Sequence, residues 1–240
     1  MPEQQSHMKS PLSERITNTV KDLYGQPVQV IESYVEGVRG RYLNPFLFVG
    51  LTAVLLATVI SFVISYPQIE VSPADPEQVE QLGEEFESYR AAELQEAIEV
   101  TAAIANTQFL GFLHFLLFPL LAVASMLFFR DTHQGFFRHL ILNTYAVGQA
   151  NVALLLLVPV WMIFGDQLMK PAVHLYPSAF LAGLVLLFIY NRYLFLESLT
   201  DWIKAFSALI LGYFFYSLIA GFVVAIIAFL VYMALAVGGG

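Results

Sequence analysis

The sequence has no cysteine among its 240 residues. This absence excludes disulfide bonds, thiol nucleophiles, cysteine-ligated zinc and iron–sulfur clusters. Charged residues are also scarce, since Asp, Glu, Lys and Arg make up 12% of the chain, whereas globular proteins carry about 25%. The 11 Lys and Arg residues form no dense basic cluster, which excludes a surface for nucleic acid.

The motifs of common enzyme classes are missing too. The sequence contains no GxSxG nucleophile turn, no P-loop, no GxGxxG segment after a strand and no HExxH zinc motif. We therefore predict a protein that is not an enzyme, and we expect no cofactor and no metal site.

The sequence is instead rich in long apolar runs. It is 58% hydrophobic, with a mean hydropathy of +0.68, and a helix needs about 20 mostly apolar residues to cross a bilayer. The sequence predicts an all-α integral membrane protein with about five transmembrane helices. They are expected at 45–66, 108–129, 139–164, 178–195 and 205–237.

The positions of the basic residues predict an orientation. All but two of the 11 Lys and Arg residues, Arg90 and Lys170, fall before the first predicted helix or in the loops on that side. Basic residues mark the cytoplasmic side, so the N-terminus is predicted to be cytoplasmic and the protein a multi-pass protein of a bacterial cytoplasmic membrane. The first forty residues are polar, which argues against a cleavable signal peptide.

Two polar regions flank this membrane domain of residues 45–237. Residues 1–44 are a cytoplasmic or interfacial segment, in which apolar residues at helical spacing predict two amphipathic helices joined near Gly25 and Pro27. We favour packing of these helices on the bundle over a lipid-sensing role. Residues 67–107 are predicted to be an extracytoplasmic insertion with a helix whose polar face is mostly Glu, and a solvated face is the favoured interpretation.

The most informative internal signal is the polar first half of the predicted helix 139–164. Polar side chains inside lipid are costly and usually face protein or water. Polar residues of the next two predicted helices lie at a similar depth in the membrane. Together with the polar side chains of helix 139–164, they predict one polar meeting point of three helices. It is either a packed seam, which we favour, or a cavity open to the cytoplasm. The candidate residues are Asn143, Gln149, Asn151, Asn191, Tyr213, Tyr216 and Ser217.

A second candidate is the loop that precedes this helix. Arg130, His133, Arg138 and His139 lie there, at the predicted cytoplasmic interface. Helix capping and salt bridges are the favoured interpretation of these side chains. A lipid headgroup is the functional alternative, since clustered basic groups at this interface attract anionic headgroups.

One stretch resembles a known family. Residues 34–46, YVEGVRGRYLNPF, match the pattern Y-x-E-G-x-R-x-x-Y-x-x-P-x, and the chain resembles a bacterial polytopic membrane family catalogued as domain of unknown function 3667 over residues 20–235. The start of the third helix, Phe137 to Leu140 with Tyr145, is similar as well. Members of that family often carry an N-terminal cysteine-rich zinc ribbon, which this chain lacks. The resemblance implies the membrane class and no particular chemistry.

These observations leave three functional hypotheses, of which the least favoured is a membrane enzyme that acts on a lipid headgroup near Arg130–His139, and the other two are the following. The first is a scaffold or accessory subunit without enzymatic activity. The alternative is a transporter of small solutes or lipids that uses a cytoplasm-facing polar cavity. The partners expected are the lipid bilayer and either another membrane protein or a second copy of the chain.

Overall fold

The computed structural model describes residues 11–38, 40–65, 110–132, 134–163 and 171–238. These residues form α-helices, short 3₁₀ helices and connecting turns, and no strand occurs among them. The acidic insertion predicted at 67–107 and the candidate His133 lie outside the described residues.

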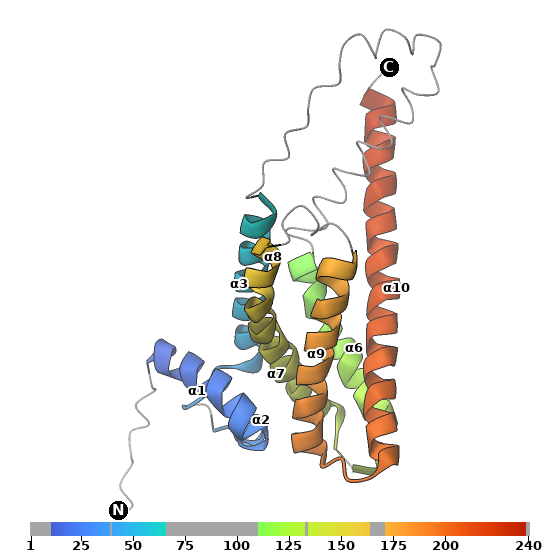
Figure 1. The fold of residues 1–240 in the computed structure, drawn as a ribbon. Coiled ribbons are helices and arrows are strands. Elements are labelled where there is room, and N and C mark those ends of the chain that lie inside the picture. Colours follow the sequence, from blue (N-terminus) through green and yellow to red (C-terminus); the bar gives the residue numbers. More distant parts are fainter. Residues whose placement is uncertain (1–10, 39, 66–109, 133, 164–170, 239–240) are drawn as a thin grey trace, which may run out of the picture.

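The chain begins with a helical hairpin made of α1 (Leu12–Gly25) and α2 (Pro27–Val35), seen at the lower left of Figure 1. Pro27 is the first residue of α2, where its missing N–H costs no helical hydrogen bond. Leu23, Val30 and Ile31 are fully buried in the same core as the long helices. The hairpin therefore packs against the bundle, as the favoured interpretation of residues 1–44 predicted.

Five longer helices follow: α3 (Pro45–Ser65), α6 (Leu110–Phe128), α7 (Phe136–Leu154), α9 (Pro171–Leu194) and α10 (Leu199–Gly238). In Figure 1, α7 crosses the middle of the molecule, and it contacts α3, α6, α9 and both hairpin helices. A Cβ atom at Gly148 would lie 2.6 Å from the Phe48 ring. Glycine therefore lets α7 and α3 approach closely, as small residues do between membrane helices.

The helix that begins as α7 changes its geometry in its apolar half. A short 3₁₀ turn, η3 (Leu155–Leu157), follows α7 and leads into α8 (Val158–Ile163). Pro159 explains the change, because proline cannot donate to the carbonyl four residues earlier and its ring clashes with that carbonyl. The predicted helix 139–164 is thus, as far as Ile163, a continuous helical segment that contains one 3₁₀ turn.

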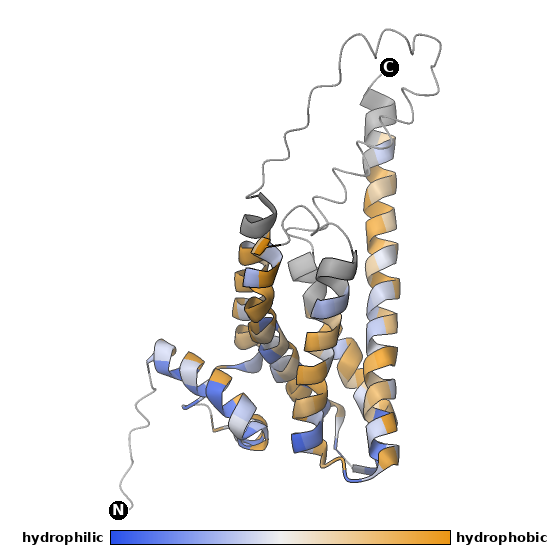
Figure 2. Ribbon diagram, viewed as in Figure 1, coloured by the Kyte–Doolittle hydropathy of each residue, from blue (hydrophilic) through white to orange (hydrophobic). Residues whose placement is uncertain are grey.

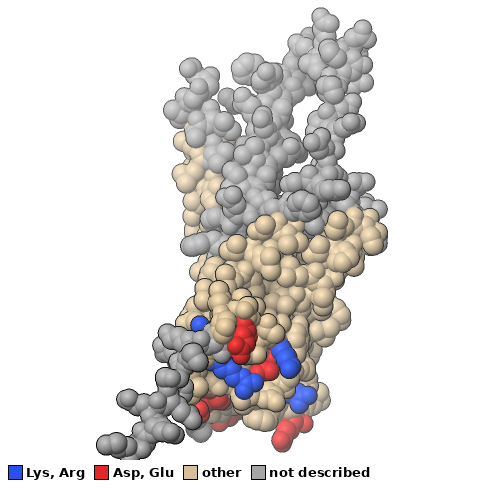
Figure 3. All heavy atoms as spheres, turned by 90° about the vertical axis from the view of Figure 1, so that its left-hand side faces the viewer, with Lys and Arg blue, Asp and Glu red and all other residues tan. Residues whose placement is uncertain are grey.

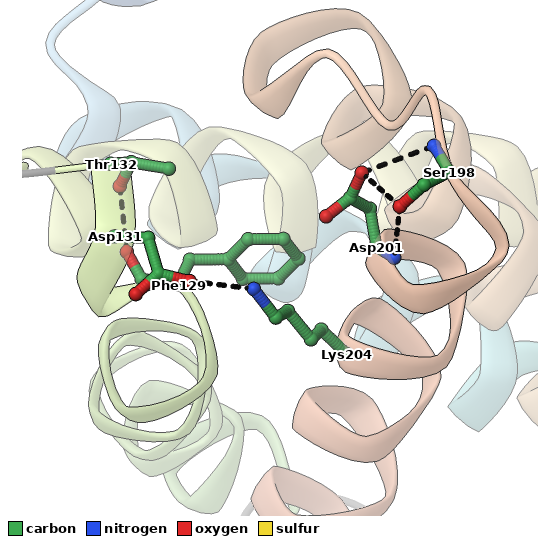
Figure 4. Close-up of polar contacts among 6 residues, drawn as sticks. All are labelled: Phe129, Asp131, Thr132, Ser198, Asp201 and Lys204. Atoms are coloured by element: carbon green, nitrogen blue, oxygen red, sulfur yellow. Dashed lines mark hydrogen bonds and ion pairs between the residues drawn. The ribbon is translucent and has the colours of Figure 1, made fainter.

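The last helix, α10, is the longest, with 40 residues. It begins six residues earlier than predicted because Ser198 and Asp201 cap its start. The Asp201 carboxylate accepts from the Ser198 N–H at 3.1 Å, and the Asp201 N–H donates to the Ser198 hydroxyl at 3.2 Å (Figure 4). At 1.5 Å per residue the helix is about 60 Å long, about twice the thickness of a hydrocarbon core.

The helices have the length and composition of a membrane protein, which confirms the predicted class. Within the described residues, three helical segments are long and apolar enough to cross a membrane: Phe136–Ile163, Tyr176–Leu194 and Leu199–Leu230. Pro45–Ile60 and Phe115–Phe128 are shorter apolar helices. Apolar residues cover most of the surfaces of α3, α9 and α10 in Figure 2, as expected for helices that face lipid.

One end of the bundle carries the described charges. We call it the charged end, and it comprises α1, α2, η2 (Arg130–Thr132), the start of α7, the end of α9 and the start of α10. Figure 3 shows basic and acidic side chains gathered at the lower part of one face of the molecule. The Lys and Arg residues that the structure describes all belong to this end: Arg15, Lys21, Arg41, Arg130, Arg138, Arg192 and Lys204.

Candidate functional site

A buried hydrogen-bond network joins α6, α7 and α9 near the charged end. Asn143 of α7 donates to the Ser125 hydroxyl of α6 at 3.0 Å and accepts from the Tyr190 hydroxyl of α9 at 2.6 Å. Ser125 also lies 3.0 Å from His139 Nδ1. All four residues are fully buried, so the polar atoms of Asn143 serve to connect three helices.

The other two amides of α7 point toward different neighbours. The Gln149 side chain donates to the Val20 carbonyl of α1 at 3.2 Å, and Asn151 donates to the Thr52 hydroxyl of α3 at 3.4 Å. Both residues are buried. The three amides predicted to share one meeting point therefore make three separate contacts.

The remaining candidates of the predicted meeting point lie at its edge or outside it. Tyr213 and Tyr216 of α10 are partly buried and pack against the main core. Asn191 is partly buried near the end of α9, whereas Ser217 is exposed. The structure brings Asn143 together with His139, Ser125 and Tyr190. Tyr213 and Tyr216 of α10 instead pack against the apolar core.

The basic residues around the 130–139 loop are also dispersed. Arg130 is exposed in η2, while His139 points inward to Ser125. Arg138 forms an ion pair of 3.0 Å with Glu32 of α2, and Glu32 also accepts from the Tyr193 hydroxyl at 2.5 Å. Arg138 and His139 thus make contacts between helices, and the favoured interpretation of capping and salt bridging stays a prediction for the group as a whole.

A further ion pair ties the start of α10 to η2, the short 3₁₀ helix that follows α6. Lys204 donates to the Asp131 carboxylate at 2.7 Å, and the Thr132 hydroxyl donates to the Phe129 carbonyl at 2.7 Å (Figure 4).

Within the described ranges, no three His, Asp or Glu side chains gather in a way that could hold a metal ion.

The Glu32 contacts give a prediction about the hairpin. Glu32→Ala removes the carboxylate that receives both Arg138 and Tyr193. Hydrogen bonds to a charged group contribute about 1.5–3 kcal/mol when buried, and with partial exposure we expect docking of the hairpin to weaken by about 1–2 kcal/mol. Limited proteolysis should then cut α1 and α2 faster. Glu36→Ala, at an exposed position just after α2, is the control and should leave the cleavage rate unchanged; equal rates in both variants would contradict the role of Glu32.

A cavity of about 170 Å³ lies between the hairpin and the bundle. The hairpin, the connection to α3 and α7 each supply part of its wall. Its lining residues are Arg15, Tyr34, Val38, Tyr42, Leu43, Asn44 and Tyr145.

Hydrogen bonds hold the walls of this cavity in place. The Arg15 guanidinium donates to the Tyr42 carbonyl from Nε at 3.2 Å and from Nη2 at 2.9 Å. The Tyr145 hydroxyl donates to the Leu43 carbonyl at 2.6 Å, and Asn44 Nδ2 donates to the Tyr34 hydroxyl at 3.1 Å. These bonds join the connection to α1, α2 and α7.

The hydroxyl group of Tyr42 makes a further contact with α1. That hydroxyl donates to Asp22 at 3.0 Å. Burial, and then the hydrogen bond to Asp22, raise the pKa of Tyr42 to about 12. The hydroxyl therefore stays protonated at neutral pH and remains a donor to Asp22.

Sequence reasoning did not identify these cavity residues as a site, although a signal was present. Tyr34, Tyr42 and Asn44 all lie in the segment that carries the family resemblance. Aromatic, amide and basic residues are dense there, just before an apolar helix. Arg15 gave no such signal, because only the folding of the hairpin brings it to Tyr42.

Comparison with known proteins places the family likeness in the same region. No curated protein and no solved structure matches the chain. The family model described as "Protein of unknown function (DUF3667)" matches residues 14–57, which comprise most of α1, all of α2, the connection and the beginning of α3. The predicted resemblance to this family of unknown function is thereby confirmed over the segment that supplies all but one of the cavity residues.

Proposed function

We propose that the protein is a scaffold or accessory subunit, without enzymatic activity, of a bacterial cytoplasmic membrane. The charged end is proposed to face the cytoplasm, in keeping with the preference of Lys and Arg for that side. The chain would then cross the membrane five times. The crossing segments would be α3, α6, the continuous segment from α7 to α8, α9 and α10.

The observation that carries this proposal is the burial of the inner polar side chains. Asn143 and Gln149 are 0% exposed and Asn151 is 1% exposed, and each one bonds a neighbouring helix. A transporter that used these amides would need them in contact with water. Contacts of this kind stabilise helix packing by about 0.6–2 kcal/mol each, which suits a permanent structural role.

The surface of α10 supports a role in assembly. This helix contacts mainly α6, and the most apolar 18-residue window within Leu199–Leu230 contains no buried residue. Phe214, Phe222 and Phe229 are all more than half exposed. Such a helix offers a long apolar face to lipid and to the transmembrane helix of another protein or of a second copy.

Cysteine labelling tests the proposal directly, because the native chain has no cysteine. We expect Gln149→Cys and Asn151→Cys in native membranes to resist a water-soluble maleimide, since both side chains are enclosed by helices. Gln26→Cys, exposed between α1 and α2, is the positive control. Labelling is read as the mass shift of the purified chain.

The same experiment discriminates the alternative function. If Gln149→Cys were labelled from the cytoplasmic side as fast as Gln26→Cys, the closed interior would be contradicted and a transporter with a polar cavity favoured. Addition of denaturant should make both inner cysteines reactive, which controls for loss of the thiol.

A further inference from the structure

The cavity beside the hairpin is lined by side chains that carry more hydrogen-bond donors than the bonds described above engage. A guanidinium has five N–H donors, and the two bonds to the Tyr42 carbonyl engage two of those of Arg15. Asn44 Nδ2 has two N–H donors, and its bond to Tyr34 engages one. Arg15 and Asn44 thus hold donors for a ligand at the wall of the cavity.

The charge of the lining is positive. Arg15 is the charged residue of the lining, which includes no carboxylate. The nearby Asp22 is not a lining residue, and its carboxylate accepts from Arg41 at 2.8 Å and from the Tyr42 hydroxyl at 3.0 Å. A guanidinium with neighbouring N–H donors favours an anion with several acceptor oxygens, such as a phosphate group.

The volume of the cavity and the apolar side chains around it restrict the class of ligand further. Pockets that hold drug-sized ligands enclose about 300–1,000 Å³, so a cavity of about 170 Å³ suits a small anionic group and not a large metabolite. Exposed apolar side chains adjoin it: Val38 at its rim is 56% exposed, and Phe46 and Leu47 begin the lipid-facing side of α3. An acyl chain attached to the anion would lie along that side.

We propose that the cavity between the hairpin and α7 binds the phosphate group of an anionic phospholipid headgroup, with Arg15 and Asn44 as donors. This site is independent of the scaffold role, since it does not involve the buried amides of α7. A free phosphate monoester shares the same chemistry, and the experiment below separates the two sources.

The test uses the full chain in bilayer nanodiscs of phosphatidylcholine with a minority of phosphatidylglycerol. Native mass spectrometry after release from the disc measures how much phosphatidylglycerol remains bound. Arg15→Gln removes the charged donor, and Val38→Trp fills the cavity from its exposed rim without touching a donor. Arg192→Gln, with the same change of charge at an exposed position of α9, and Tyr24→Trp, at an exposed site of the same hairpin, are matched controls.

We expect both cavity variants to weaken phosphatidylglycerol binding by about tenfold or more, because a charge-assisted hydrogen bond is lost or blocked, while both controls bind like the native chain. If Arg15→Gln does not fold, Val38→Trp still decides the matter. Calorimetry with inorganic phosphate forms a second arm. Binding of phosphate that depends on Arg15, without retention of the lipid, would support an anion site supplied from solution.

Two results would overturn the proposal. One is equal retention of phosphatidylcholine and phosphatidylglycerol by the native chain, together with no binding of phosphate. The other is a folded Val38→Trp variant that binds both probes as the native chain does.

Discussion

Replacing Gly212 with valine is expected to loosen the attachment of α10 and to lower the free energy of unfolding by about 1–3 kcal/mol. A Cβ atom at this position would lie 2.5 Å from Leu121 Cδ2 and 3.2 Å from the Leu121 Cα of α6. Leu121 is fully buried, so it has little room to move. Because α6 is the main neighbour of α10, the two helices must separate. Thermal unfolding in detergent measures the loss.

Gly221→Val in the same helix is the matched control. A Cβ atom at Gly221 meets nothing within 4 Å, so the same change of residue type carries no packing cost there. An equal loss of stability in the two variants would attribute the effect to the helix backbone and contradict the close contact of α10 with α6.

Asn143→Leu is expected to have the second large effect, a loss of about 1–3 kcal/mol of stability. Leucine keeps a similar size but cannot accept from the Tyr190 hydroxyl, which is fully buried. A buried hydroxyl without its partner incurs a desolvation cost, whereas the loss of both partners is nearly neutral.

A double-mutant cycle with Tyr190→Phe isolates this effect. In the Tyr190→Phe background the cost of Asn143→Leu should fall, because no hydroxyl is left unpaired. Strict additivity of the two changes would show that the bond between α7 and α9 contributes nothing. Asn191→Leu, at a partly buried position on α9, controls for the general effect of removing an amide from this region.

Local sequence signals predicted the helices well. Pro27 and Pro45 are the first residues of α2 and α3, since proline is favoured at this position. The start of α10 was placed too late, because Asp201 and Lys204 look like loop residues in an apolarity pattern. In the structure Asp201 is a cap and Lys204 pairs with Asp131, and that pairing depends on the tertiary fold.

The polar meeting point was predicted less well, for a geometric reason. A helix turns about 100° per residue, so Asn143 and Gln149 lie about 120° apart around α7, and Gln149 and Asn151 about 160° apart. The three side chains therefore cannot face one point. Asn143 reaches α6 and α9, Gln149 reaches α1, and Asn151 reaches α3. The sequence shows how deep in the membrane each polar residue of α7 lies. It does not show which helix packs against each face of α7.

The docking of the hairpin sets an order for biogenesis. Glu32 bonds Arg138 and Tyr193, which follow it by 106 and 161 residues. At about 5–20 residues per second of synthesis, the carboxylate emerges from the ribosome roughly 10–30 s before its last partner. The hairpin therefore cannot complete its docking until α9 has been synthesised, so the last step in its attachment comes late in translation.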